Sequence, residues 1–157
     1  FFSHVLCPTM STIFNENQKF TNANGDVVTS SHLADMTKIA IYFSAHWCPP
    51  CRGFTPKLAE AYKTIKAQHP DFEIIFVTSD RDEASFKEYV STMPWLALPF
   101  GDASIPTLKK QYNVTGIPLL VVIDGDGNLI TKEARNIIHT DEPQKYANVW
   151  DKFTKNP

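Results

Sequence analysis

The fold is decided by one stretch, residues 38–51, whose sequence is KIAIYFSAHWCPPC. Residues 38–44 are nearly all apolar, which is the pattern of a strand buried on both faces of a sheet. Cys48 and Cys51 follow after a short loop, and apolar residues then recur every three or four positions along residues 49–68. That period indicates a helix with one buried stripe. The stretch therefore predicts a buried strand that ends at a cysteine pair, where a helix begins.

The flanking sequence alternates between strand and helix patterns. Asn24-Gly25 is a strong hairpin signal between two short strands near the N-terminus. We expect strands at 19–21, 27–29, 72–78, 119–123 and 128–131, helices at 82–90, 104–112 and 142–153 with N-caps at Ser104 and near Asp141, and a proline-interrupted connection at 93–100. This order predicts an α/β fold of three layers: a central mixed sheet, helices on both faces, and an added N-terminal β-hairpin.

Composition indicates one globular domain. The chain has 157 residues, of which 43% are hydrophobic and 20% charged, and its formal net charge is −2. We expect a single domain over residues 12–157, a tail at residues 1–11, and a monomer. The near-neutral charge predicts no affinity for nucleic acid or for an anionic membrane. No apolar run reaches the roughly 20 residues that cross a bilayer.

The cysteine pair predicts thiol chemistry. A disulfide between Cys48 and Cys51 would close too small a loop to stabilise the fold much, because that stabilisation grows with loop length. At a helix N-terminus, free backbone N–H groups and the helix dipole stabilise a thiolate. Cys48 is therefore the candidate nucleophile, and Cys51, one turn further along, is the candidate resolving thiol. Pro49 and Pro50 stiffen the turn between them and are expected to leave Cys48 exposed.

Other interpretations of the cysteines are weaker. A zinc site normally needs four ligands, and the pair supplies only two. Two inert core cysteines would be an unusual choice at this edge of a sheet. A peroxidase would use Arg52 and Thr55 beside a reactive thiol, but an adjacent resolving cysteine favours disulfide exchange. Cys7 is expected to be an incidental thiol of the tail. We expect no metal and no bound cofactor.

The sequence resembles the tryparedoxins and nucleoredoxins, which are thioredoxin-like proteins. The resemblance rests on YFSAHWCPPCRGFTP at 42–56 and continues through SDR at 79–81, MPWL at 93–96 and GIP at 116–118. It implies a thioredoxin-like fold and a thiol–disulfide oxidoreductase without a bound cofactor. It also implies a cis peptide bond before Pro118. The substrate-binding residues that it implies are Trp47, Pro49, Pro50, Ile117, Pro118 and Arg135.

Two departures from the family pattern refine this expectation. Thioredoxins proper have a buried aspartate where this chain has Tyr42, and a phenol with a pKa near 10 is a poor base for Cys51. Tryparedoxins that use trypanothione have a tryptophan and acidic residues where this chain has Ser79-Asp80-Arg81, which favours the nucleoredoxin side of the family. Arg135 matches an arginine that holds a small thiol in some tryparedoxins, and it is equally compatible with a solvated surface residue.

The function predicted from these features is the reduction of protein disulfides in the cytosol, and also in the nucleus. The expected partners are disulfide-containing proteins and an upstream reductase or low-molecular-weight thiol. Two alternatives stay open at this point. Nucleoredoxins also suggest a redox-dependent adaptor that holds a protein partner, and the added hairpin is shared with exported or membrane-tethered thiol reductases.

Overall fold

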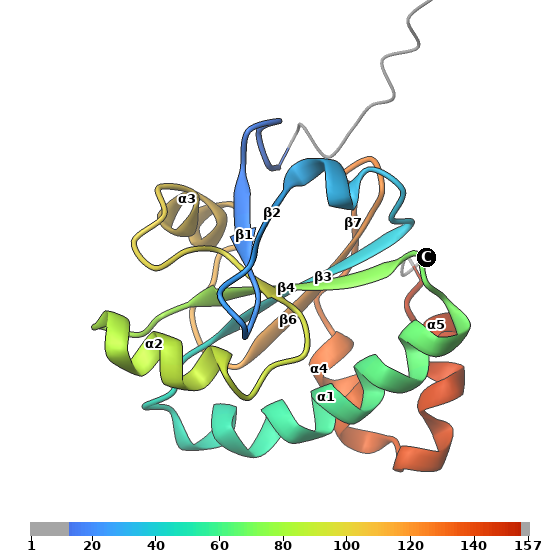
Figure 1. Cartoon of the computed structure of the whole chain (residues 1–157). Helices are drawn as coiled ribbons and strands as arrows, with labels where there is room; N and C mark the ends of the chain where they lie inside the picture. The colour runs from blue at the N-terminus through green and yellow to red at the C-terminus, as the bar shows by residue number, and fades with distance from the viewer. Residues whose placement is uncertain (1–12, 155–157) are drawn as a thin grey trace, which may run out of the picture.

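The computed structural model describes residues 13–154. Its strands form one mixed sheet in the order β2-β1-β5-β4-β3-β6-β7 (Figure 1). The strands are β1 (Lys19–Thr21), β2 (Val27–Thr29), β3 (Lys38–Ser44), β4 (Phe72–Thr78), β5 (Leu96–Ala97), β6 (Leu119–Asp124) and β7 (Leu129–Thr131). The helices are η2 (Ser30–Leu33), α1 (Pro49–Gln68), α2 (Glu83–Val90), α3 (Ser104–Gln111), α4 (Ala134–Thr140), η3 (Pro143–Asn148) and α5 (Val149–Lys152). The predicted α/β fold with an N-terminal hairpin is confirmed.

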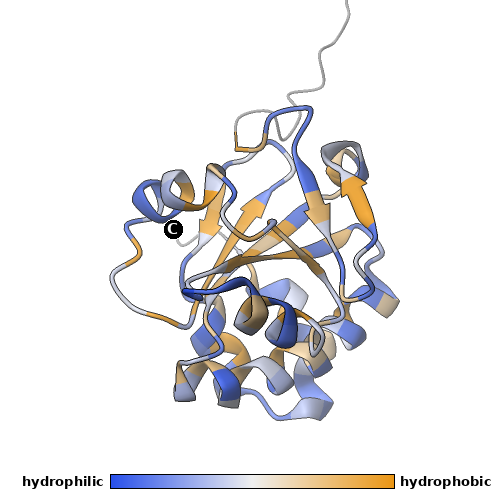
Figure 2. Cartoon of the chain, turned by 60° about the vertical axis from the view of Figure 1, so that its left-hand side comes forward, coloured by the Kyte–Doolittle hydropathy of each residue, from blue (hydrophilic) through white to orange (hydrophobic). Residues whose placement is uncertain are grey.

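The alternation of side chains along β3 builds two cores. Ile39, Ile41 and Phe43 point to one face of the sheet, where α3 and η2 cover them. Ala40 and Tyr42 point to the other face, which packs against α1, α2, α4 and the C-terminal helices. Successive strand residues alternate in this way because the backbone is pleated. The most hydrophobic ribbon accordingly lies in the strands between the two helical layers (Figure 2).

The central strand pairings set the position of the cysteines. β3 pairs in parallel with β4 and antiparallel with β6, so it has neighbours on both edges. Ser44, the last residue of β3, lies opposite Thr78, the last residue of β4. The loops after these two strands therefore meet at one edge of the sheet. In open α/β sheets, this carboxyl edge is where reactive groups gather.

The short strand β5 was not expected from the sequence. It lies in the proline-interrupted connection at 93–100 and has only two residues. Ala97 pairs with Thr21 of the hairpin on one side and with Phe76 of β4 on the other. Through this contact the hairpin becomes an extension of the main sheet, which local sequence patterns cannot reveal.

The C-terminal part of the prediction was partly wrong. The structure has a separate helix α4 at 134–140, then the 3₁₀ helix η3 and one turn of α5, in place of one helix over 142–153. The backbone is extended at Asp141 and Glu142. Pro143 follows them, and a residue before proline is disfavoured in the helical region. The Asp141 carboxylate caps no helix and accepts from Lys152 Nζ at 2.7 Å.

The predicted start of α3 is also corrected. Its N-cap is Ala103, and Ser104 is the first helical residue. The Ser104 hydroxyl donates to Gln18 Oε1 at 2.8 Å, which ties α3 to the segment before β1. The expected tail at residues 1–11 lies outside the described residues, and the assignment of residues 12–157 to one domain stays a proposal. Within residues 13–154, no helix is long and apolar enough to cross a membrane.

Candidate active site

The cysteine pair lies where β3 passes into α1, as predicted. Cys48 is the N-cap of α1 and has an extended backbone, while Pro49 and Pro50 occupy the first helical positions. Proline is well suited to the first positions of a helix, because a backbone N–H there would have no acceptor within the helix and proline has no N–H to leave unpaired. The Cys48 carbonyl accepts from the backbone N–H of Arg52 at 3.1 Å and so begins the helical hydrogen bonding. Both cysteines are free thiols.

The prediction that Cys48 is exposed was wrong. Only 5% of Cys48 is accessible, and Cys51 is fully buried. Cys48 packs with Ala45, Cys51 and the partly buried Ile117. Its sulfur lies 3.9 Å from the Ile117 carbonyl oxygen, which belongs to a loop that the local pattern around the cysteines does not reveal. The accessible part of this edge consists of the neighbouring Trp47 and the two prolines.

Cys51 has a raised pKa. Burial is the largest cause, and the neighbouring Cys48 thiol adds to it, so that the pKa of Cys51 is raised to about 11. Hydrogen bonds from the Ser44 side chain and the Ala45 backbone act in the opposite direction. A thiol in this environment stays protonated near neutral pH and is shielded from solvent.

A cluster of buried hydroxyl groups lies beside Cys51. Thr55 Oγ1 donates to the Cys51 carbonyl at 3.0 Å and lies 2.8 Å from Tyr42 Oη and 2.6 Å from Tyr89 Oη. Ser44 Oγ lies 2.8 Å from Tyr89 Oη and 3.1 Å from Tyr42 Oη. Burial raises the pKa of both tyrosines. The expectation that Tyr42 is a poor base is therefore supported.

Sequence patterns missed this cluster because its members come from different elements. Ser44 ends β3, Thr55 lies in α1 and Tyr89 lies in α2. A hydroxyl among apolar residues of a helix gives no local sign of its partner in another layer. The Thr55 hydroxyl, a candidate for peroxidase chemistry by sequence, makes its hydrogen bonds with the Cys51 carbonyl and the two phenols.

The loop before Pro118 faces the cysteine pair. The Ile117–Pro118 peptide bond is cis, as the resemblance implies. Ile117 is half-buried against Cys48, and Pro118 is buried. Arg135, at the start of α4, is half-buried, and its Nη1 donates to the Pro118 carbonyl at 3.4 Å. The structure therefore brings the Arg135 side chain to this loop.

Trp47 borders the site on the opposite side. Half of its surface is exposed, and its indole N–H donates to the Ser79 carbonyl at 3.1 Å. The Arg81 guanidinium lies over the indole ring, 5.2 Å from its centre. The loop after β4 thus orients the tryptophan that precedes Cys48. The contact between Arg81 and the Trp47 ring was not predicted.

Asp80 joins the loops after β3 and β4. Its buried carboxylate accepts from the His46 backbone N–H at 2.8 Å and from the Thr78 hydroxyl at 2.8 Å. This aspartate anchors the segment just before the cysteines. Its position directly after a buried strand is the only sequence signal that could have indicated the role.

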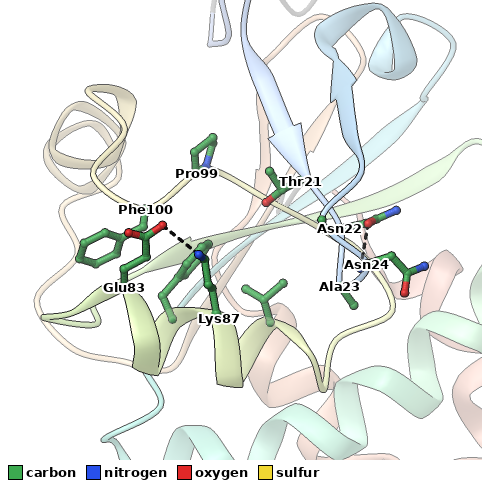
Figure 3. Close-up of a pocket in the computed structure, with 11 residues that line it drawn as sticks. Thr21, Asn22, Ala23, Asn24, Glu83, Lys87, Pro99 and Phe100 are labelled. Carbon is green, nitrogen blue, oxygen red and sulfur yellow. Dashed lines mark hydrogen bonds and ion pairs between the residues drawn. The ribbon is translucent and has the colours of Figure 1, made fainter.

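The surface has one hollow that adjoins the site and another that lies away from it. A hollow of about 440 Å³ is lined by His46, Arg52, Thr55 and Tyr89 among others, so it reaches the hydroxyl cluster. Another, of about 540 Å³, lies between the hairpin turn and α2 (Figure 3). No cysteine lines that second hollow. Within residues 13–154, no group of three or more potential metal ligands is arranged to hold a metal ion.

The model of a thioredoxin-like family matches residues 35–129, which is more than half of the chain and includes the cysteine pair. The chain belongs to the thioredoxin-like family. This thioredoxin-like chain is 55% identical over 115 residues to probable nucleoredoxin 1 of Arabidopsis thaliana, covering 73% of the chain and 20% of that relative. It is 48% identical over 120 residues to mouse nucleoredoxin, covering 76% of the chain and 27% of that relative.

Solved structures agree with this membership. Tryparedoxin I from Leishmania major superposes with a TM-score of 0.76 at 37% identity, covering 83% of this chain and 89% of that one. The resemblance to nucleoredoxins and tryparedoxins is thus confirmed, and with it membership of an oxidoreductase family. The thioredoxin-like chain spans only about a fifth to a quarter of the length of the two nucleoredoxins.

Proposed function

We propose that the chain reduces disulfides of proteins through Cys48 and Cys51. The Cys48 thiolate attacks one sulfur of the substrate disulfide, forms a mixed disulfide and releases the other substrate sulfur as a thiolate. The Cys51 thiol then attacks the Cys48 sulfur, its proton passes to the departing substrate sulfur, and the second half of the substrate leaves as a thiol. Two electrons pass to the substrate, and the two cysteines end as a disulfide, which an external thiol donor reduces.

One observation carries the proposal: the two thiols have unequal environments. Cys48 caps the N-terminus of α1, where the helix favours an anion. Cys51 is fully buried one turn further along, and its pKa is raised to about 11. Such a pair suits two separate roles, attack by Cys48 and resolution by Cys51. The thiolate is the nucleophile, and the protonated, fully buried Cys51 does not compete for substrate.

The substrate-binding part of the proposal uses the residues around Cys48. We propose that the backbone at Ile117, whose carbonyl oxygen lies 3.9 Å from the Cys48 sulfur, pairs with an extended substrate backbone. Pro118 and Arg135 support that loop, and Trp47, Pro49 and Pro50 offer an accessible surface on the other side. A folded or extended protein segment can therefore approach without a deep pocket.

The proposed setting is a reducing one. A Cys-x-x-Cys pair acts as a reductant where glutathione or thioredoxin reductase keeps thiols reduced, so we place the protein in the cytosol, and also in the nucleus. The proposed partners are disulfide-containing proteins and an upstream reductase or small thiol. We propose that it works as a monomer without a bound cofactor.

Single cysteine variants test the mechanism. Cys51→Ser is expected to accumulate mixed disulfides with an oxidised protein substrate, because the attacking thiol remains and the resolving thiol is gone. Cys48→Ser is expected to trap almost none, and both variants should reduce insulin no faster than buffer. Non-reducing gels and the turbidity of reduced insulin measure this, with thioredoxin reductase, glutathione and trypanothione offered separately as donors. Equal trapping by the two variants would contradict the assigned roles.

The same variants separate a reductase from an adaptor. A reductase stops turning over when Cys51 is lost. An adaptor instead binds its partner non-covalently, so dithiothreitol does not release that partner. If Cys51→Ser holds its partner through a bond that dithiothreitol breaks, the reductase proposal stands. A complex of unchanged affinity in Cys48→Ser would favour the adaptor.

A further inference from the structure

The arginines of the chain lie in segments that border the dithiol. There are only three of them, Arg52, Arg81 and Arg135, beside twelve lysines. Arg52 lies in the first turn of α1, next to Cys51. Arg81 lies over the ring of Trp47, the residue before Cys48, and Arg135 donates to the carbonyl of Pro118. We call these three residues the arginine rim.

The arginine rim flanks Cys48 on both sides. Arg81 follows β4 and Arg135 follows β7, and the sheet order β4-β3-β6-β7 places the end of β3 between them. Cys48 itself touches Ile117, whose neighbour Pro118 is the partner of Arg135. A substrate segment that crosses Cys48 from the β4 side to the β6 side therefore passes Arg81 and then Arg135.

Within the part of the chain that the structure describes, residues 13–154, the arginine rim has no ion-pair partner. Among residues 13–154, all five ion pairs use lysine or histidine as the cation, and none includes an arginine. The two aspartates next to Arg81 are engaged elsewhere. Asp80 accepts from His46 and Thr78, and Asp82 accepts from the Ser85 N–H at 2.8 Å.

Arginine at these places suits one kind of substrate chemistry. Its guanidinium offers several N–H donors in a plane and binds a carboxylate through two parallel hydrogen bonds. The Arg81 guanidinium also lies over an aromatic ring, 5.2 Å from its centre, and this contact restricts the side chain before a substrate binds. The formal net charge of the chain is −2, so the attraction for anions is local to this edge of the sheet.

We propose that the arginine rim selects polypeptide segments in which acidic residues flank the target disulfide, with Arg81 on Trp47 as the main contact. This inference rests on the proposed disulfide reduction and adds the substrate class. The carboxylates are held beside Cys48 while the disulfide sulfur faces the attacking thiol. The covalent steps are those given above, and the carboxylates take no part in them.

The test uses three cyclic disulfide peptides that differ only in the residues on either side of the cysteines, which are Glu, Gln or Lys. The pre-reduced protein is mixed with each peptide, quenched in acid and alkylated, which gives the second-order rate constant for a single turnover without any donor. We expect the Glu peptide to react about 5–20-fold faster than the Lys peptide at low salt, because each exposed charge pair contributes only modestly. The preference should fall in 0.5 M NaCl because salt screens exposed charges.

Matched variants locate the preference. Arg81→Gln should reduce the Glu-to-Lys ratio about two- to five-fold. Lys19→Gln removes the same charge from an exposed position of β1, three strands from β3, and should leave the ratio unchanged. An equal fall in both variants would overturn the role of Arg81, as would equal rates for the three peptides. Thermal unfolding of each variant establishes that it is folded.

Two further comparisons are needed. One distinguishes a carboxylate on a polypeptide from a carboxylate on a small thiol, and the other distinguishes the acidic preference from disulfide reduction itself. Dithiodiglycolate and cystamine are small disulfides of opposite charge. If these two differ while the peptides do not, the rim serves a small anionic thiol and the polypeptide claim fails. If the Gln peptide reacts but charge has no effect, disulfide reduction stands and only the acidic preference is lost. If no peptide reacts, both proposals fail.

Discussion

The two ends of the central strands both bury polar groups, but they differ in whether the cations beside them are paired. At the amino end of β4, the buried Glu73 accepts from Tyr62 Oη at 2.9 Å and faces Lys66 Nζ at 3.6 Å and His32 Nε2 at 3.4 Å. At the carboxyl end, the side chains around Cys51 are neutral hydroxyls, and the arginines at the surface have no ionic partner within residues 13–154. Within residues 13–154, the cations at the amino end face a carboxylate, and the arginines at the carboxyl end do not form ion pairs.

This contrast separates stability from reactivity within one sheet. Glu73 and Thr78 lie in the same strand, about 17 Å apart at 3.3 Å for each residue. A buried carboxylate is tolerated only where donors and cations satisfy it. Unpaired cations at the dithiol stay available for a substrate, at little cost because they are solvated. Changes at the Glu73 end should therefore alter the free energy of unfolding, and changes at the dithiol should alter rates.

The largest effect on stability is expected from Glu73→Ala. It leaves the Tyr62 hydroxyl, which is buried, without its acceptor, and we expect a loss of about 1–3 kcal/mol in the free energy of unfolding. Urea denaturation measures it.

Glu73→Gln is the matched control, because the amide oxygen still accepts from Tyr62, and it should lose less than the alanine variant. Adding Tyr62→Phe to Glu73→Ala should recover part of the loss by removing the orphaned hydroxyl. The Glu73→Ala and Glu73→Gln variants should keep the disulfide-reduction rate per folded molecule. A fall in that rate with unchanged stability would break the separation of the two ends.

A smaller effect is expected from pH at the dithiol end. Cys51 keeps its proton in the folded state up to a pKa of about 11, whereas an unfolded cysteine ionises near 8.5. The unfolded state therefore loses its proton first, so the stability contributed by this thiol is complete below about pH 8.5 and is lost as the pH rises toward 11. Between pH 8 and pH 10.5, the reduced wild type should lose about 1–2 kcal/mol more than Cys51→Ala.

Urea denaturation of both proteins across this range, under a reductant, measures the difference. Groups distant from Cys51 that titrate in the same range contribute equally to the two curves and cancel. Parallel curves would mean that burial does not hold the Cys51 proton, and the unequal environments of the two thiols would then be in doubt.

The smallest effect is expected from an exposed ion pair on α2, beside the hollow of Figure 3. Lys87 Nζ lies 3.4 Å from Glu83 Oε1, and the two side chains are 72% and 62% exposed (Figure 3). Lys87→Ala should change the free energy of unfolding by less than about 0.5 kcal/mol. Thermal melts at low salt and in 0.5 M NaCl measure it. A loss as large as that of Glu73→Ala would show that pairing, and not burial, distinguishes the amino end of the sheet.

Much of the fold could be predicted from the sequence because its signals are local. The apolar run before the cysteines, the helical stripe after them and Asn24-Gly25 each depend on neighbours in the chain, and all three elements are present. The two-residue β5 has no pattern of its own and exists only because Thr21 and Phe76 flank it. The break before Pro143 had a sequence signal, the proline itself, which the helical period outweighed.

The candidate site divides in the same way. The sequence by itself determined the cysteine pair at a strand-to-helix junction, since proline and cysteine at adjacent positions restrict the backbone and supply the thiols. Only the tertiary structure decided that Cys48 is covered by Ile117, that hydroxyls from three elements surround Cys51, and that Arg81 rests on Trp47. Contacts between residues far apart in the chain depend on how the layers pack, and packing is a property of the whole sheet that no short stretch of sequence contains.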